Sequence, residues 1–178
     1  LTLIARAGSF KTAMLQNMLK NYINNSAWAA VFFSIEMPIS SVTERYHEIV
    51  QGCTGKDIEN FYQSGLEGAE KFVSDLEKGF IEKLRGLYTI PTKVGISDIG
   101  AYVRLIETGF NVKVGVIGID YMGLMDAPGN NEYEVVSKLA RDIKGMAKML
   151  NLPVIVLAQT SRKAGSGTVA VSLDHARG

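Results

Sequence analysis

The sequence predicts an α/β fold in which a mainly parallel central sheet carries helices on both faces. Five short apolar runs alternate along the chain with segments of helical periodicity, and such alternation implies parallel strands joined by right-handed crossovers. Residues 113–120 (KVGVIGID) are apolar almost throughout, as in a strand that is covered on both faces. At 178 residues, the chain has the length of one such domain.

The first 50 residues are predicted to form two strand–helix units. Residues 1–4 form a strand that passes through a loop with Gly and Ser into a helix. The apolar positions of this helix have near-helical spacing, namely Met14, Met18, Leu19 and Tyr22. Residues 29–35 (AAVFFSI) form a second buried strand, and Pro38 suits the first turn of a helix that continues to about residue 50.

The middle of the chain is predicted to be mostly helical. Residues 56–86 form one short and one long helix with scattered charges, in a layer at the periphery of the domain. A brief strand over 87–90 follows. The next helix covers 97–108, and Ser97 and Asp98 supply capping groups at its start.

The last third of the chain repeats the strand–helix–strand order. The strand over 113–120 ends in an acid, and residues 126–131 (DAPGNN) have turn composition. A helix over 132–150 places seven apolar residues on one face, namely Val135, Val136, Leu139, Ile143, Met146, Ala147 and Leu150. A fifth strand over 153–158 precedes a polar, Gly-rich tail over 161–178, which we expect to be a loop.

Composition excludes several classes of protein. Hydrophobic residues make up 47% and charged residues 21%, which is ordinary for a folded globular protein. Lys and Arg total 19 against 18 Asp and Glu, so any contact with nucleic acid must be local. Cys53 is the single cysteine and no apolar run approaches a bilayer-spanning length, so a cytoplasmic location is expected. The chain begins with Leu1, and we expect residues 1–178 to be one domain of a longer protein.

A phosphate-binding loop is predicted between the first strand and the first helix. Residues 5–12 (ARAGSFKT) follow the pattern G-x-x-x-x-G-K-[ST], except that Ala5 and Phe10 replace the two glycines. Phe10 must adopt a tolerable φ or turn its ring away from the phosphates, and Gly8 can take the tight turn. The alternative is a helix start that merely contains Lys-Thr.

In this loop, backbone N–H groups and the positive end of the helix would hold phosphates. Lys11 would reach the β- and γ-phosphates of ATP, and the Thr12 hydroxyl would bind Mg²⁺. The nucleotide-binding residues predicted here are Arg6, Ala7, Gly8, Ser9, Phe10, Lys11 and Thr12.

Three polar side chains stand where predicted strands end. Asp120 can reach the Mg²⁺ beside Thr12, although it could instead cap the following turn. Glu36 can polarise the water that attacks the γ-phosphate, or it could be a solvated loop residue. Gln159 can contact the γ-phosphate, or it could bond to loop backbone. Together with the phosphate loop, these residues indicate a RecA-like P-loop NTPase core that hydrolyses ATP.

Four segments of the chain resemble the DnaB helicase family. They are FFSIEM (32–37), GIDYMGLM (118–125), EVVSKLARDIKGMAK (134–148) and LPVIVLAQTSRK (152–163). The resemblance extends over essentially the whole chain and is weakest over residues 53–90. It implies the motor domain of a replicative helicase, which hydrolyses ATP to move along single-stranded DNA and unwind the duplex.

The resemblance also implies roles for individual residues. Glu36 would be the catalytic base, Asp120 the Walker B metal ligand and Gln159 the γ-phosphate sensor, while Lys11 and Thr12 keep their loop roles. Further family positions are matched by Arg141, Lys144 and Arg162.

The assembly that the resemblance implies is a ring-shaped hexamer, with primase or a helicase loader as further partners. Two central loops, near residues 126–134 and 161–172, would grip the DNA, with Arg162 and Lys163 on its phosphates. The alternative for these two cations is simple solvation.

Two features depart from the family pattern. Phe10 stands where the family has glycine, which bears on the catalytic rate, and the chain stops at Gly178, before the strands and the arginine finger that the family places further on. The alternatives to a helicase motor are another RecA-like ATPase, such as a recombinase or a RadA-like or KaiC-like protein, and a nucleotide-binding scaffold with weak hydrolysis.

Overall fold

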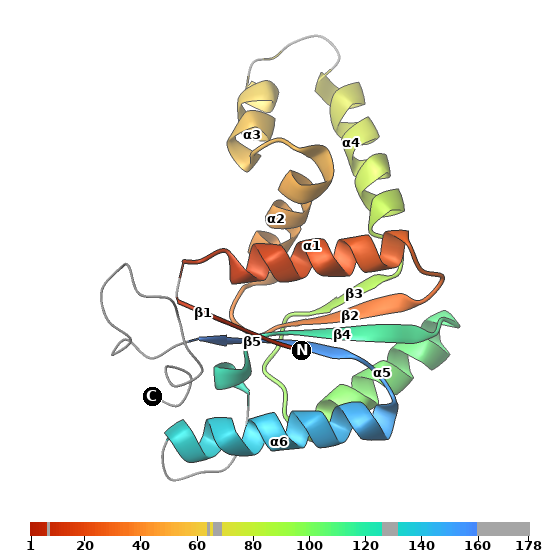
Figure 1. Ribbon diagram of the computed structural model, residues 1–178. Coiled ribbons are helices and arrows are strands. Elements are labelled where there is room, and N and C mark those ends of the chain that lie inside the picture. The colour runs from red at the N-terminus through yellow and green to blue at the C-terminus, as the bar shows by residue number, and fades with distance from the viewer. Residues whose placement is uncertain (7, 64, 66–68, 126–131, 160–178) are drawn as a thin grey trace.

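The computed structural model describes residues 1–6, 8–63, 65, 69–125 and 132–159 (Figure 1). Its core is a sheet of five parallel strands in the order β1-β5-β4-β2-β3. The strands are β1 (Thr2–Ala5), β2 (Ala29–Ser34), β3 (Leu87–Ile90), β4 (Val114–Asp120) and β5 (Val154–Gln159). The predicted α/β fold with a parallel central sheet is therefore confirmed.

Helices connect these strands and cover both faces of the sheet. They are α1 (Lys11–Asn24), α2 (Ile39–Gln51), α3 (Gly55–Gln63), α4 (Ala69–Lys83), α5 (Ile96–Phe110), the short 3-10 helix η1 (Met122–Leu124) and α6 (Glu132–Leu150). All predicted helices are present, and most of their ends differ from the prediction by one or two residues. The short helix η1 was not predicted.

Alternating side chains of the buried strand β2 divide the core into two halves. Ala30 and Phe32 face a cluster that contains Leu15 and Leu19 of α1, together with apolar residues of α2. Val31 and Phe33, one position away, face the larger cluster beneath α5 and α6. Figure 1 shows α1 on one side of the sheet and α5 and α6 on the other. A strand that is covered on both faces has a nearly continuous run of apolar residues, so β2 and β4 were easy to predict from the sequence.

The buried face of α1 differs from the predicted one. Leu15, Leu19 and Ile23 are buried, whereas Met14 is 56% exposed. The reason lies in the sheet: a Cβ at Gly118 of β4 would come within 2.8 Å of Leu19 and 3.2 Å of Leu15. Because glycine has no Cβ, α1 can approach β4 with these two leucines in the contact, which rotates Met14 outward.

The start of α5 corrects one capping prediction. The N–H of Gly95 donates to the Asp98 carboxylate at 2.8 Å, so Asp98 does cap the helix as expected. Ser97 is not the cap, because its hydroxyl bonds to the Asp98 carboxylate, at 3.5 Å. The helix starts one residue earlier than predicted, which places Ser97 inside the first turn.

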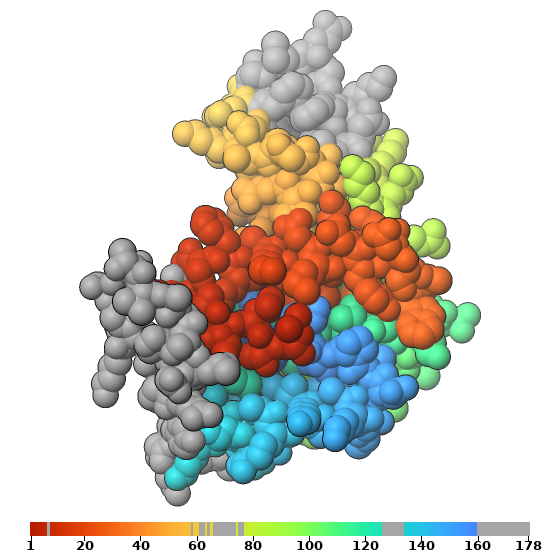
Figure 2. Space-filling view, viewed as in Figure 1, coloured from red at the N-terminus to blue at the C-terminus, as the bar shows by residue number. Residues whose placement is uncertain are grey.

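Helices α3 and α4 form the predicted peripheral layer, and α2, which the prediction did not include, stands with them. In the space-filling view this layer stands above the body that holds the sheet (Figure 2). It is attached through α2 and the end of α4, where Tyr46 and Phe80 join the cluster that contains Leu19. In the described part of the chain, no helix combines the length and apolar character needed to cross a membrane.

Candidate functional site

The carboxyl ends of four strands meet at one edge of the sheet. Ala5, the last residue of β1, is in register with Gln159 of β5, and Ser34 of β2 is in register with Asp120 of β4. Because the strands are parallel, their last residues lie at the same edge of the sheet. The predicted residues at the ends of β4 and β5 and just after β2 are thus neighbours of the start of α1.

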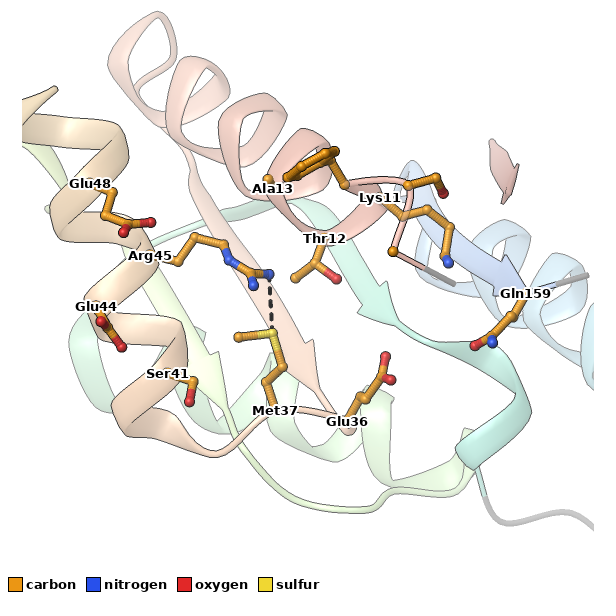
Figure 3. Close-up of a pocket in the computed structure, with 13 residues that line it drawn as sticks. Lys11, Thr12, Ala13, Glu36, Met37, Ser41, Glu44, Arg45, Glu48 and Gln159 are labelled. Carbon is orange, nitrogen blue, oxygen red and sulfur yellow. Dashed lines mark hydrogen bonds between the residues drawn. The ribbon is translucent and has the colours of Figure 1, made fainter. Parts of the chain in front are cut away.

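A cavity of about 600 Å³ opens at this edge (Figure 3). Seven predicted residues line it, namely Gly8, Ser9, Phe10, Lys11, Thr12, Glu36 and Gln159. Six others also line it, namely Ala13, Met37, Ser41, Glu44, Arg45 and Glu48. A concave polar site of this size at the carboxyl edge of a parallel sheet is the usual location for a ligand in this class of fold.

The loop before α1 is closed by hydrogen bonds to one carbonyl. The backbone N–H and the hydroxyl of Ser9 donate to the carbonyl oxygen of Arg6, at 3.4 and 2.6 Å. The Lys11 ammonium donates to the same oxygen at 2.9 Å. A phosphate is a stronger acceptor than a neutral carbonyl, so an arriving phosphate can take over the ammonium from Arg6.

Phe10 adopts the backbone conformation that a glycine would favour. Its φ is 57° and its ψ 23°, in the left-handed region, and it precedes α1 as the N-cap residue. Phe10 is 82% exposed and lines the cavity. Gly8, with φ of 74°, takes the other tight turn, as expected. Gly8 and Phe10 therefore both have left-handed backbone conformations, which are costly for Phe10 because it carries a side chain.

Replacing Phe10 with glycine is expected to raise the melting temperature by roughly 2–4 °C, because about 1 kcal/mol of left-handed strain disappears. The ATPase rate should also rise, because an exposed ring leaves the rim of the cavity. Thermal unfolding and steady-state hydrolysis measure the two effects. Phe10→Ala separates them, since it removes the ring but keeps a Cβ at the strained φ. A glycine variant less stable than the wild type would contradict the strain argument.

Thr12 lines the cavity and is hydrogen-bonded to Asp120, which is buried behind it and does not line the cavity itself. The Thr12 hydroxyl donates to Oδ2 of Asp120 at 2.6 Å, although the two residues are 108 positions apart. Asp120 is 1% exposed. Burial raises the pKa of its carboxyl, and the nearby Glu36 carboxylate also raises it, while the Thr12 hydrogen bond and Lys11 act in the opposite direction.

The remaining oxygen of Asp120 fits the requirements of a divalent cation. Oδ1 is buried and has no hydrogen-bond partner within the described part of the chain. An unpaired buried carboxylate oxygen beside a hydroxyl is the oxygen set that Mg²⁺ binds together with phosphate and water. Among the described residues no group of three or more His, Cys, Asp and Glu forms a metal cage. A metal here would thus depend on the ligand's own oxygens.

Asp120→Asn is expected to stabilise the nucleotide-free protein and to abolish hydrolysis. Burial raises the pKa of the Asp120 carboxyl, so its charged form has a cost that a neutral amide avoids, and the amide oxygen of Asn can still accept the Thr12 hydroxyl. We expect the melting temperature to rise by roughly 2–4 °C, as for about 1 kcal/mol gained at an active-site position. Calorimetry without nucleotide measures the melting temperature. A variant that melts below the wild type would contradict the argument that burying the Asp120 charge destabilises the protein.

Glu36 is held in place by its backbone, and its side chain lines the cavity. The N–H groups of Ile35 and Glu36 both donate to the carbonyl oxygen of Asp120, at 2.8 and 3.3 Å. The first residues after β2 are therefore tied to the end of β4. Figure 3 shows the side chains of Glu36 and Gln159 pointing into the space near Lys11.

Some predicted residues lie elsewhere. Arg6 contributes its carbonyl oxygen and does not line the cavity. Arg141 and Lys144 are exposed on α6, across the sheet from α1. Ala7, Arg162 and Lys163 lie outside the described residues, as do most of both predicted DNA loops.

Sequence reasoning missed the wall of the cavity that α2 provides. Its members are Ser41, Glu44, Arg45 and Glu48. Their spacing of i, i+3, i+4 and i+7 places them on one face of α2. The available signal was a polar stripe on the helix that follows a strand-end acid, because Val42, Tyr46 and Val50 mark the opposite, buried face.

The chain matches a family of known proteins over most of its length. The family model described as DnaB-like helicase C terminal domain matches residues 1–168. A replicative DNA helicase DnaB from Nostoc sp. is 27% identical over 85% of this chain, which spans 17% of that protein. Another from Mycoplasma pneumoniae is 30% identical over 89% of this chain, which spans 34% of it.

Solved structures share the fold. One that is described as an ATPase domain superimposes with a TM-score of 0.76 at 22% identity, covering 91% of this chain and 57% of that one. A DnaB-like replicative helicase, solved in a study of its interactions with primase, gives a TM-score of 0.77 at 22% identity and covers 91% of this chain and 39% of that one. The chain thus spans only part of the proteins that it matches.

Proposed function

Because the chain belongs to the family of DnaB-like helicase C-terminal domains, we propose that it is the ATP-hydrolysing motor domain of a replicative DNA helicase. Membership confirms the resemblance that its sequence segments indicated. The observation that carries the proposal is that Lys11, Thr12, Glu36 and Gln159 line one cavity, while Asp120 accepts a hydrogen bond from Thr12.

Each side chain has one task in the proposed hydrolysis. The loop N–H groups and the Lys11 ammonium bind the β- and γ-phosphates of ATP. Thr12 and Asp120 would hold Mg²⁺, which neutralises charge on the phosphates. Glu36 orients the attacking water and accepts its proton, and Gln159 senses whether the γ-phosphate is present. Phosphoryl transfer needs positioning and charge more than covalent chemistry, and these groups supply both.

The proposed partners are those that the family resemblance implies. Single-stranded DNA would pass through a ring of six subunits in the cytoplasm, with Arg162 and Lys163 on its phosphates. One structural neighbour is described with its interactions with primase, and we propose primase or a helicase loader as a further partner here. Ring closure needs head-to-tail interfaces, and a neighbouring subunit would supply an arginine to the transferring phosphoryl group.

The test is ATP hydrolysis by the full-length protein with and without single-stranded DNA. We expect hydrolysis that depends on Mg²⁺ and rises when DNA is added. Hydrolysis that ignores DNA would favour another RecA-like ATPase, and nucleotide binding without hydrolysis would favour a scaffold. Either result would overturn the proposed DNA motor.

A further inference from the structure

We propose that Gln16 of α1 is a positioning residue for hydrolysis, which holds the segment that carries Glu36 in place relative to the phosphate loop. The side chain of Gln16 is fully buried, and its amide Nε2 donates a hydrogen bond to the carbonyl oxygen of Val42 in α2, at 3.3 Å. The bond thus joins the two helices whose residues border the cavity. This inference rests on the proposed function and adds to it a residue that does not line the cavity.

Stability alone does not favour a glutamine at this position. The amide oxygen Oε1 of Gln16 is buried and has no hydrogen-bond partner among the described residues. An unpaired buried oxygen costs free energy, and an apolar side chain of similar shape in place of a buried amide is often neutral or stabilising. The Val42 carbonyl would keep a partner without Gln16, because a carbonyl inside an α-helix also accepts the N–H four residues further on. The hydrogen bond between the helices is therefore what the amide contributes.

On the α1 side, Gln16 lies one helical turn from the phosphate site. It follows Thr12 by four positions, so the two side chains lie on the same face of α1. Thr12 lines the cavity, and its hydroxyl donates to Asp120 at 2.6 Å. The hydrogen bond from Gln16 to α2 therefore fixes α2 relative to the helix that also positions Thr12.

On the α2 side, a short hydrogen-bonded segment joins Val42 to Glu36. The Val42 N–H donates to the carbonyl oxygen of Pro38 at 3.1 Å, and the Ser34 hydroxyl donates to that of Met37 at 3.0 Å. Figure 3 shows Glu36 and Met37 directly before α2, across the cavity from the start of α1. A shift of α2 away from α1 would therefore be passed to Glu36, whose placement decides how well it orients the attacking water.

Single-turnover hydrolysis of ATP by the full-length protein tests this inference. Gln16→Met keeps the approximate shape of the side chain and removes the hydrogen bond. We expect the rate to fall by about 10- to 100-fold, as for a catalytic group displaced by up to about 1 Å. ATP affinity should be retained, and the melting temperature should stay at or above that of the wild type. Asn17→Met is the matched control, because Asn17 is exposed on the same helix and its amide bonds to the Ala13 carbonyl of that helix.

A double-mutant cycle with Glu36→Gln shows whether Gln16 acts through Glu36. If it does, Gln16→Met should lower the rate strongly when Glu36 is present. It should have little further effect in the Glu36→Gln variant, which has no base left to displace. A residue that only supports the fold would lower both rates by the same factor. Gln16→Leu repeats the cycle with a second apolar side chain, so the test does not depend on the folding of one variant.

The outcomes separate this inference from the proposed function. A slow Gln16→Met variant with intact stability and a non-additive cycle supports the positioning role. Equal factors in the cycle, an unchanged rate, or lost stability in both apolar variants overturns it, and Gln16 is then a residue of the fold alone. The proposed function still stands in those cases if the wild type hydrolyses ATP and Glu36→Gln does not. If the wild type does not hydrolyse ATP, the proposed function fails and this inference fails with it.

Discussion

Lys11→Ala is expected to abolish productive ATP binding. The ammonium already stands at the cavity, where it donates to the Arg6 carbonyl at 2.9 Å, and an arriving triphosphate would give it a charged acceptor instead. Without the Lys11 ammonium, the β- and γ-phosphates lose their main positive partner. The backbone of the loop should not change. We expect ATP affinity to fall on the order of 100-fold or more, since charged hydrogen bonds each contribute about 1.5–3 kcal/mol.

Nucleotide titration measures this loss, with thermal unfolding as a check that the fold survives. Lys20→Ala is the matched control, because Lys20 lies on the same helix but does not line the cavity. Unchanged ATP affinity in Lys11→Ala would remove the phosphate-loop assignment and with it most of the proposed function.

The sequence predicted the sheet better than the surfaces that pack on it. β2 and β4 are buried on both faces, so their residues are apolar without interruption and their limits are easy to place. The face of α1 was predicted one position out, because its rotation depends on the space left by Gly118. Gly118 and the two leucines that it admits, Leu15 and Leu19, are about 100 positions apart in the sequence. The apolar periodicity within α1 alone cannot predict a contact between such distant segments.

In the site, too, the residues that depend on the sheet were predicted, and those that depend on packing between helices were not. Residues at strand ends were predicted because parallel strands bring their carboxyl ends to one edge, so local sequence and topology were enough for Asp120, Glu36 and Gln159. Arg45 lies inside a helix, where a cation is ordinarily a solvated residue. Only the packing of α2 beside the phosphate loop turns its polar face toward the cavity. Phe10 was recognised as a departure, but its left-handed φ is a property of the folded loop.

Glu36→Gln is expected to keep nucleotide affinity and to lower turnover by a factor on the order of 10² to 10⁴, the usual contribution of a positioned base. The amide matches the carboxylate in shape, and the Glu36 backbone keeps its bond to the Asp120 carbonyl, so the cavity should not change. What is lost is the negative charge that accepts a proton from water. Removing that charge also relieves repulsion toward the phosphates, so ATP affinity should hold or rise slightly.

Single-turnover hydrolysis is the decisive measurement, because it follows the chemical step without the contribution of product release. Glu82→Gln, at an exposed position of α4, controls for the loss of one negative charge. The combination of retained ATP binding and slow chemistry would separate Glu36 from Lys11, whose loss acts on binding. If instead Glu36→Gln turned over ATP near the wild-type rate, then Glu36 would be a loop carboxylate, and the water would have to be activated by another group at the cavity.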